Sequence, residues 1–253
     1  LSIRRQRQMC IRDSPCTGIC SAYFVRSCSM EEMEVLLMKE MKICLPVYKI
    51  IYSICFIVFL SLVRGISSIA EIGITMDAYI AVLAIVFCAD TYWMEHSGKR
   101  WEVFCLYSVK KRKQTILKRL VVQWIFLWGL ALIGYGLFFW QAPHNLNTIP
   151  SMLLFAVYVP EVLVTISFWS TFAMTVTNLL RNLWGGIGLS IILWLSLNSV
   201  TGESVLGKFN VFSFVFRDTQ NIKNMEWLWG KGIALCLTVL MAALVSAIIK
   251  KRG

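Results

Sequence analysis

Charged side chains are scarce in this sequence of 253 residues: Asp, Glu, Lys and Arg make up 15% of it, whereas hydrophobic residues make up 58%. Soluble domains carry about 25% charged and about 45–50% apolar residues. So little charge cannot cover so apolar a core, which excludes an ordinary soluble protein. The excess of 25 Lys and Arg over 14 Asp and Glu therefore does not indicate a nucleic-acid partner. We expect an all-α, polytopic membrane protein that contacts lipid.

Histidine is scarcer still, since the chain contains only His96 and His144. Both fall in polar segments that we place on opposite sides of the membrane, which excludes a His-based metal site or nucleophile–base pair within it. Ser97-Gly98 also lacks the preceding Gly-x of a rhomboid-like nucleophile elbow. We therefore expect no catalytic residue, no metal ligand and no enzyme activity in this chain.

The sequence also lacks a complete phosphate-binding loop. Gly202 to Lys208 follow the pattern G-x-x-x-x-G-K, but Phe209 stands where a Ser or Thr hydroxyl would hold Mg²⁺. No soluble strand precedes this segment, and we place it outside the cell. The match is a chance one, and nucleotide chemistry has to come from another polypeptide.

A secretory signal peptide is absent from residues 1–29, which contain no apolar core before a small-residue cleavage site. The run from Met9 to Ser14 resembles translated sequencing-adapter DNA. We predict that residues 1–29 are a non-native or disordered leader and that the native protein starts at Met30. Residues 30–253 would then form one six-span membrane domain.

Long hydrophobic runs are abundant. Apolar residues recur at helical spacing from Met30 to Cys44, which predicts a helix lying in the membrane interface and ending near Pro46. Lys49 follows closely enough to reach back to water, and a short loop with Glu71 and Asp77 leads to the second run. The apolar runs predict six transmembrane helices at about 46–63, 75–93, 121–140, 151–175, 185–200 and 230–249.

The basic residues indicate the orientation of these spans. With both termini in the cytoplasm, fifteen Lys and Arg from Met30 onward lie inside and five lie outside. Basic residues favour cytoplasmic loops, so we predict that both termini are cytoplasmic. The polar connector between the second and third spans is then cytoplasmic as well.

This connector runs from Glu95 to Leu120 and holds eight basic residues. Residues from Trp101 to Ser108 recur at a spacing that places them on one helical face. Lys110 to Lys113 interrupt the pattern before it resumes towards the third span. We predict two short helical pieces at the membrane surface with a basic joint between them.

The connector resembles that of ABC type-2 transporter permeases, in which a Glu, a Gly, a second Glu and a Leu-rich turn follow the second span. The chain has these residues in that order, before its basic joint: Glu95, Gly98, Glu102 and Leu106. It lacks the Pro of the family's turn, carries Lys99 where Thr is more usual, and has a spacing from Gly98 to Glu102 that is one residue looser. Thr175–Asn182 and Lys208–Phe212 resemble two further recurrent stretches of the family.

The resemblance implies one membrane half of an ABC exporter in the bacterial plasma membrane. Two six-span subunits, identical or different, would pair around a substrate path. Separate ATP-binding subunits would hold ATP and Mg²⁺, so this chain would bind no cofactor. The residues expected to contact the ATP-binding subunit are Glu95, Gly98, Trp101, Glu102, Phe104 and Leu106. Residues 99–119 have an alternative interpretation, since their positive charge also suits anionic lipid headgroups.

Glu161 is an acidic residue near the middle of a predicted span, next to Pro160. Placing a charge there costs at least about 2.5–3.5 kcal/mol on insertion scales. Two roles stay open: a group facing the translocation path, which binds a cationic substrate or a proton, and a neutral or hydrogen-bonded group that packs the bundle. Asp90, one turn from the cytoplasmic end of its span, is expected to be solvated or to act in coupling.

Two further functions also stay open. The first is an ion-coupled secondary carrier that uses Glu161, and the second is a membrane scaffold or sensor without transport. The carrier is disfavoured because no inverted repeat of three spans is evident in the sequence. A neighbouring reading frame for an ATPase would favour the exporter.

Overall fold

The computed structural model describes residues 41–96, 104, 106–141, 150–217 and 225–252, and no β-strand occurs among them. The predicted all-α class is therefore confirmed for this part of the chain. The predicted leader at residues 1–29 lies outside the described residues. The predicted surface helix does so too, except for Met41–Cys44, which are helical.

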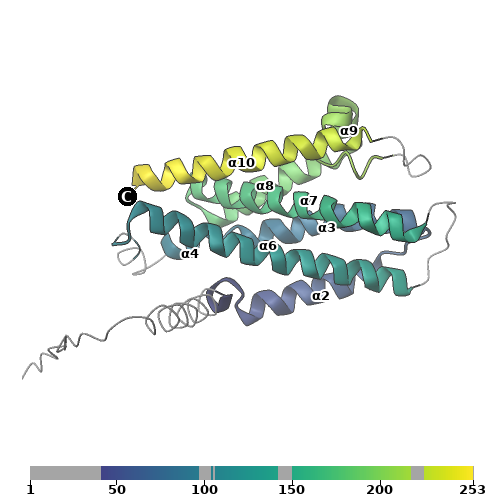
Figure 1. Ribbon diagram of the computed structural model, residues 1–253, viewed down its shortest axis with the longest axis horizontal. Coiled ribbons are helices and arrows are strands. Elements are labelled where there is room, and N and C mark those ends of the chain that lie inside the picture. Colours follow the sequence, from purple (N-terminus) through teal and green to yellow (C-terminus); the bar gives the residue numbers. More distant parts are fainter. Residues whose placement is uncertain (1–40, 97–103, 105, 142–149, 218–224, 253) are drawn as a thin grey trace, which may run out of the picture. The chain divides into compact units, whose positions relative to one another are not determined.

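The described residues form long helices joined by short connections. In chain order these elements are α2 (Val47–Val63), α3 (Ile69–Cys88), α4 (Trp93–His96), α6 (Val109–Trp140), α7 (Ser151–Leu180), α8 (Leu183–Leu197), α9 (Val200–Leu206), the 3₁₀ turn η1 (Gly207–Phe209) and α10 (Trp227–Arg252). The long helices run side by side, with α4 and the start of α6 at one end and α9 at the other (Figure 1). We call the end with α4 and the start of α6 the basic end, and the end with α9 the opposite end.

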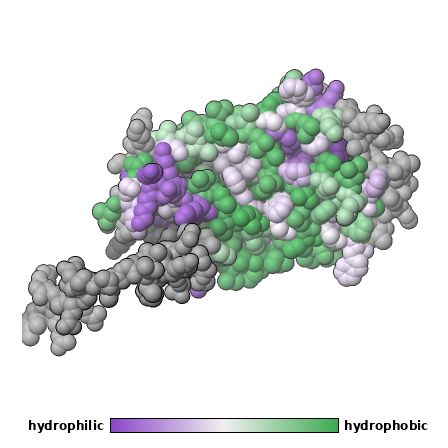
Figure 2. All heavy atoms as spheres, viewed as in Figure 1, coloured by the Kyte–Doolittle hydropathy of each residue, from purple (hydrophilic) through white to green (hydrophobic). Residues whose placement is uncertain are grey.

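Four helical segments are long and apolar enough to cross a membrane: Ile69–Glu95, Val109–Trp140, Ser151–Leu180 and Trp227–Ile249. Helix α8 and the segment that follows it, bent by 71°, add a fifth if they form one span, and α2 is a shorter apolar helix. Figure 2 shows apolar side chains over the middle of the helices and hydrophilic ones gathered nearer the ends. The chain is therefore a helical membrane protein, and the number of six spans stays a prediction.

Helix α3 is the centre of the packing. It contacts α2, α6, α7 and α8, and most of its residues are buried, among them Ile72, Ile80 and Phe87, whereas Val86 on another face is 39% exposed. A largely apolar helix with neighbours on most of its surface offers few positions at which a charged side chain reaches water. Every charged group on α3 beyond its first turns consequently needs a partner inside the bundle.

The predicted loop that holds Glu71 and Asp77 before the second span is wrong, because both residues are helical. Helix α3 begins at Ile69 instead of residue 75, and the Glu71 carboxylate accepts a 2.9 Å hydrogen bond from Ser67 Oγ just before the first turn. The Ser67 backbone N–H donates to the same carboxylate at 3.3 Å, so Glu71 accepts from a backbone donor that precedes the helix and helps to fix its start. Asp77, predicted in the loop before this span, therefore lies inside the helix and has no exposed surface.

The predicted break at the basic joint is also wrong. Helix α6 runs without interruption from Val109 to Trp140. Its first 20 residues contain no Gly or Pro, and Lys, Arg, Gln and Leu are good helix formers. Arg112, Ile116 and Arg119 recur on one face and are buried. The basic residues thus extend the third apolar helix by three turns instead of forming a separate piece.

The sharp turn between α7 and α8 is built by two residues. Arg181 adopts the left-handed conformation (φ 53°), and the Asn182 side chain accepts hydrogen bonds of 3.0 and 3.3 Å from backbone N–H groups in the first turn of α8. The two helices then pass so closely that a Cβ on Gly186 would lie 2.1 Å from Thr177 Oγ1. The glycine-rich start of α8 therefore does permit close helix packing.

Replacing Gly186 by Ala is expected to destabilise the protein by about 1–3 kcal/mol, the usual cost of adding a methylene to a filled interior. A Cβ on Gly188 meets nothing within 4 Å, so Gly188→Ala is the matched control and should stabilise the protein slightly, by about 0.5–1 kcal/mol, through helix propensity alone. Thermal unfolding in detergent measures both variants. Equal stability of the two would contradict the close contact.

Candidate functional site

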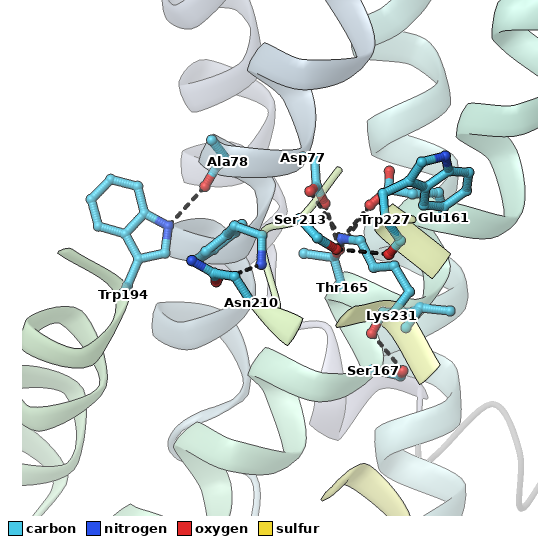
Figure 3. Close-up of polar contacts among 12 residues, drawn as sticks. Asp77, Ala78, Glu161, Thr165, Ser167, Trp194, Asn210, Ser213, Trp227 and Lys231 are labelled. Atoms are coloured by element: carbon cyan, nitrogen blue, oxygen red, sulfur yellow. Dashed lines mark hydrogen bonds and ion pairs between the residues drawn. The ribbon is translucent and has the colours of Figure 1, made fainter. Parts of the chain in front are cut away.

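Ion pairs that are largely buried occur in three places among the described residues. Two ion pairs lie near the basic end, and a larger group joins α3, α7 and α10 in the interior. The larger group, which we call the α3–α7–α10 cluster (Figure 3), has members that are at most 4% exposed: Asp77, Glu161, Thr165 and Lys231. Ionisable residues at such depth are rare in membrane helices and mark candidate functional sites.

Lys231 is the central residue of this cluster. Its Nζ donates hydrogen bonds to Asp77 Oδ2 at 3.0 Å and to Thr165 Oγ1 at 2.6 Å. It also forms an ion pair with Glu161 Oε1. The Thr165 hydroxyl in turn donates to Asp77 Oδ1. One ammonium group on α10 is therefore shared by two carboxylates and a hydroxyl on α3 and α7.

Helix spacing and one close backbone contact explain this placement. Glu161 and Thr165 are four residues apart in α7, so they share one face of that helix. Lys231 follows Gly230, at which a Cβ would lie 1.9 Å from the carbonyl oxygen of Asn210. Only glycine lets the chain pass so close to the start of α10. This approach helps to hold Lys231 against α3 and α7.

Residues 210–217, which follow η1, lie beside the cluster on the side of the opposite end. The Asn210 and Ser213 side chains donate hydrogen bonds of 2.8 and 2.7 Å to backbone carbonyls at the end of α8 and the start of α10. Phe214 is fully buried; its ring centroid lies 5.9 Å from the Lys231 ammonium and 4.0 Å from the Arg217 guanidinium. Phe214 thus contacts one cation inside the cluster and one outside it.

A small cavity of about 210 Å³ lies beside this segment. Among its lining side chains are two acids and two bases: Glu203, Lys208, Arg217 and Glu226. Burial lowers the pKa of the Arg217 guanidinium, which nonetheless keeps its charge at neutral pH. The cavity therefore presents charges of both signs at the opposite end of the bundle.

At the basic end, Lys49 of α2 lies against the last turn of α3. Its Nζ pairs with Asp90 Oδ1 at 2.5 Å and donates to the Phe87 carbonyl oxygen at 2.7 Å. The prediction that Lys49 reaches water is wrong, because its side chain is 3% exposed and finds both acceptors at the C-terminal end of α3. Asp90, expected to be solvated or to act in coupling, is 16% exposed at its side chain and held in this pair.

The predicted coupling residues occupy different environments. Glu95 is 7% exposed and pairs with Arg119 of α6 at 2.5 Å. Phe104 is buried in a small apolar cluster with residues of α6 and α10, whereas Leu106 is 83% exposed. The remaining three lie outside the described residues: Gly98, Trp101 and Glu102. A contact with an ATP-binding subunit stays a prediction for all six.

Three members of the α3–α7–α10 cluster were not predicted. Asp77 was assigned to a loop and Lys231 to an outer segment, while Thr165 carries no charge that would single it out. A signal was present for the first two, since each is an isolated ionisable residue next to a long apolar run. In the described part of the chain, no three His, Cys, Asp or Glu side chains converge to hold a metal ion.

Replacing Lys49 by Met is expected to destabilise the protein by about 3–5 kcal/mol, because Asp90 is left as an uncompensated, largely buried charge. The double variant Lys49→Met/Asp90→Asn removes that charge and should recover most of the loss. Lys118 is exposed on α6, so Lys118→Met is the control. Denaturant unfolding in detergent distinguishes the variants, and a double variant no more stable than the single one would refute this role of the pair.

Comparisons with known protein families, with curated proteins and with solved structures yield no match to this chain. No family is thereby assigned, and the resemblance to permeases stays a prediction. Its function has to be argued from the geometry and chemistry of its own residues.

Proposed function

We propose that this chain is the membrane permease subunit of an ATP-driven ABC-type exporter and forms half of the translocation path. The order of its elements supports the proposal, because a polar connector joins the second apolar helix, α3, to the third, α6. The residue order Glu95, Gly98, Glu102 and Leu106 in that connector supports it as well.

The observation that carries this proposal is the ion pair between Glu95 and Arg119. It joins α4, where the connector begins, to the part of α6 where the connector ends, and both side chains are buried. The Lys49–Asp90 pair ties α2 to the end of α3 in the same region. A force on the connector would therefore reach α2, α3 and α6 together, as a rigid-body transmission requires.

In this proposal the basic end faces the cytoplasm of a bacterial cell. An ATP-binding subunit docks on the connector and on exposed Leu106, and it supplies both ATP and Mg²⁺. A second permease subunit, either another copy of this chain or a sister chain, completes the path. Lys110 and Lys111, exposed at the start of α6, meet anionic lipid headgroups.

The α3–α7–α10 cluster favours a second candidate, an ion-coupled secondary carrier. Transporters place ionisable side chains inside the bundle, where a bound ion changes the balance of charge. Asp77, Glu161 and Lys231 have such a placement. The two candidates differ in their energy source, since the exporter needs a nucleotide-hydrolysing partner and the carrier needs only an ion gradient.

Purification of the tagged full chain from its native membrane is expected to bring an ATP-binding subunit with it. Gly98→Pro and Glu102→Lys should weaken that association by about 2 kcal/mol, roughly 30-fold in affinity, as a loss at the centre of an interface does. The exposed substitution Lys118→Gln serves as the control. Absence of any ATP-binding subunit, together with transport driven by a proton gradient alone, would favour the carrier.

Charge reversal tests the role of the Glu95–Arg119 pair. Glu95→Arg and Arg119→Glu each place two like charges in a buried site, so each should reduce the ATPase rate of the reconstituted complex by roughly 5–150-fold, the range of a 1–3 kcal/mol coupling. The double reversal restores opposite charges and should recover most of the rate. Lys118→Glu, on the exposed face of α6, changes charge without touching the pair. No recovery in the double variant, despite normal folding, would count against transmission through this contact.

A further inference from the structure

We infer that the α3–α7–α10 cluster is a proton-binding site, in which one exchangeable proton resides on Glu161 Oε2. The inference rests on the hydrogen bonds of the resting protein, so it goes beyond the proposed function and holds for either energy source. It concerns four side chains on three helices: Asp77, Glu161, Thr165 and Lys231 (Figure 3).

The donors and acceptors show which groups are charged. A Lys ammonium has three N–H groups, and Lys231 has three partners: Asp77 Oδ2, Thr165 Oγ1 and Glu161 Oε1. Both Asp77 oxygens accept hydrogen bonds, one from Lys231 and one from the Thr165 hydroxyl. Asp77 is therefore ionised, Lys231 is protonated, and their charges cancel.

The charge of Glu161, if this residue were ionised, would have no counter-ion left in the cluster. Its Oε1 faces the Lys231 ammonium, but its Oε2 is buried and has no hydrogen-bond partner among the described residues. An ionised Glu161 would give the cluster a net charge of −1 in a bundle interior, where an unpaired ion costs several kcal/mol. A proton on Oε2 makes the cluster neutral without disturbing any of its other contacts.

Other charged or titratable groups near Glu161 do not supply the missing charge. Asp77 on α3 and Lys231 on α10 already cancel. Arg217, just before the undescribed residues that precede α10, lies within electrostatic range of Glu161. It stacks on Phe214 at 4.0 Å and, among the described residues, forms no ion pair with Glu161, so it is not a direct counter-ion of that carboxylate. The remaining neighbours are phenols that are neutral at physiological pH, Tyr158 on α7 and Tyr135 on α6.

A metal cation does not fit the same position. Hard cations take six or more oxygen ligands at short distance, and Oε2 has no polar partner within hydrogen-bond range among the described residues. A proton needs only the carboxylate oxygen itself. At Oε2 the geometry therefore favours a proton over a cation such as Ca²⁺ that needs many protein oxygens.

Two tyrosines provide a route for exchange. Tyr158 lies three residues before Glu161 in α7, and its hydroxyl donates to the Ala131 carbonyl oxygen at 3.3 Å. Its ring centroid is 4.9 Å from that of Tyr135, whose buried hydroxyl has no partner among the described residues. Tyr135 in turn lies within electrostatic range of Arg217, which lines the cavity at the opposite end. Tyr158 is likewise within electrostatic range of Glu161, so the inference assigns proton exchange between the cluster and that cavity to these two hydroxyls.

Infrared spectroscopy of the purified full chain in detergent at pH 7 tests the inference. We expect the C=O stretching band of one buried, protonated carboxylic acid. The band should move in D₂O, because the proton exchanges, and it should move after labelling with ¹³C-carboxyl Glu but not with ¹³C-carboxyl Asp. Addition of Na⁺ should leave it unchanged.

Substitutions test the count of one proton. Glu161→Gln should abolish the band, and Asp77→Asn should abolish it too, because a single carboxylate then balances Lys231 and stays ionised. Glu71→Gln, outside the cluster, is the control and should leave it intact. The inference is overturned if the wild-type chain shows no such band, if the band survives Glu161→Gln, or if it follows the Asp label. If a variant fails to fold, the isotope labels still assign the band to Glu or to Asp in the wild-type protein.

Discussion

The ammonium group of Lys231 is the contact on which the arrangement of α3, α7 and α10 depends. It binds side chains from both facing helices, so none of the three can shift or rotate without leaving a charge unpaired. Replacing a complete buried ion set by apolar residues is often neutral or stabilising, whereas removing one partner is strongly destabilising. The cluster therefore acts on the relative position of the helices more than on net stability. Gly230 permits this geometry, since it lets the preceding segment press against the start of α10.

Buried ion pairs also join helices at the basic end. Lys49–Asp90 and Glu95–Arg119 join α2, α3, α4 and α6 around the connector, whereas the cluster joins α3, α7 and α10 deeper in the bundle. Helix α3 belongs to both sets and is largely buried. A displacement at the connector therefore has a direct mechanical route, through α3, to the buried α3–α7–α10 cluster.

The apolar runs predicted the helices well, because lipid demands about 20 consecutive apolar residues and no loop can replace them. They predicted helix ends poorly. Helix α3 starts two turns earlier than expected, since Asp77 is neutralised by a residue 154 positions away, and α6 extends through its basic stretch because buried Arg112 and Arg119 find partners on other segments of the chain. Long side chains of Lys and Arg were assigned to water, where most of them belong. Glu161 was recognised because it stands alone inside a predicted span.

Composition and hydropathy thus determined the class of this protein, which is helical and built for lipid. The expectation that this chain has no His-based metal chemistry and no nucleotide binding of its own stays a prediction. Only the tertiary structure decided which charges are paired, because the partners come from helices far apart in the chain and a buried ion pair leaves no local pattern. The connector's motif order is visible in the sequence, but its mechanical link to α6 is not. A charge in a membrane sequence shows that a partner must exist, and only the packing of the helices shows which residue it is.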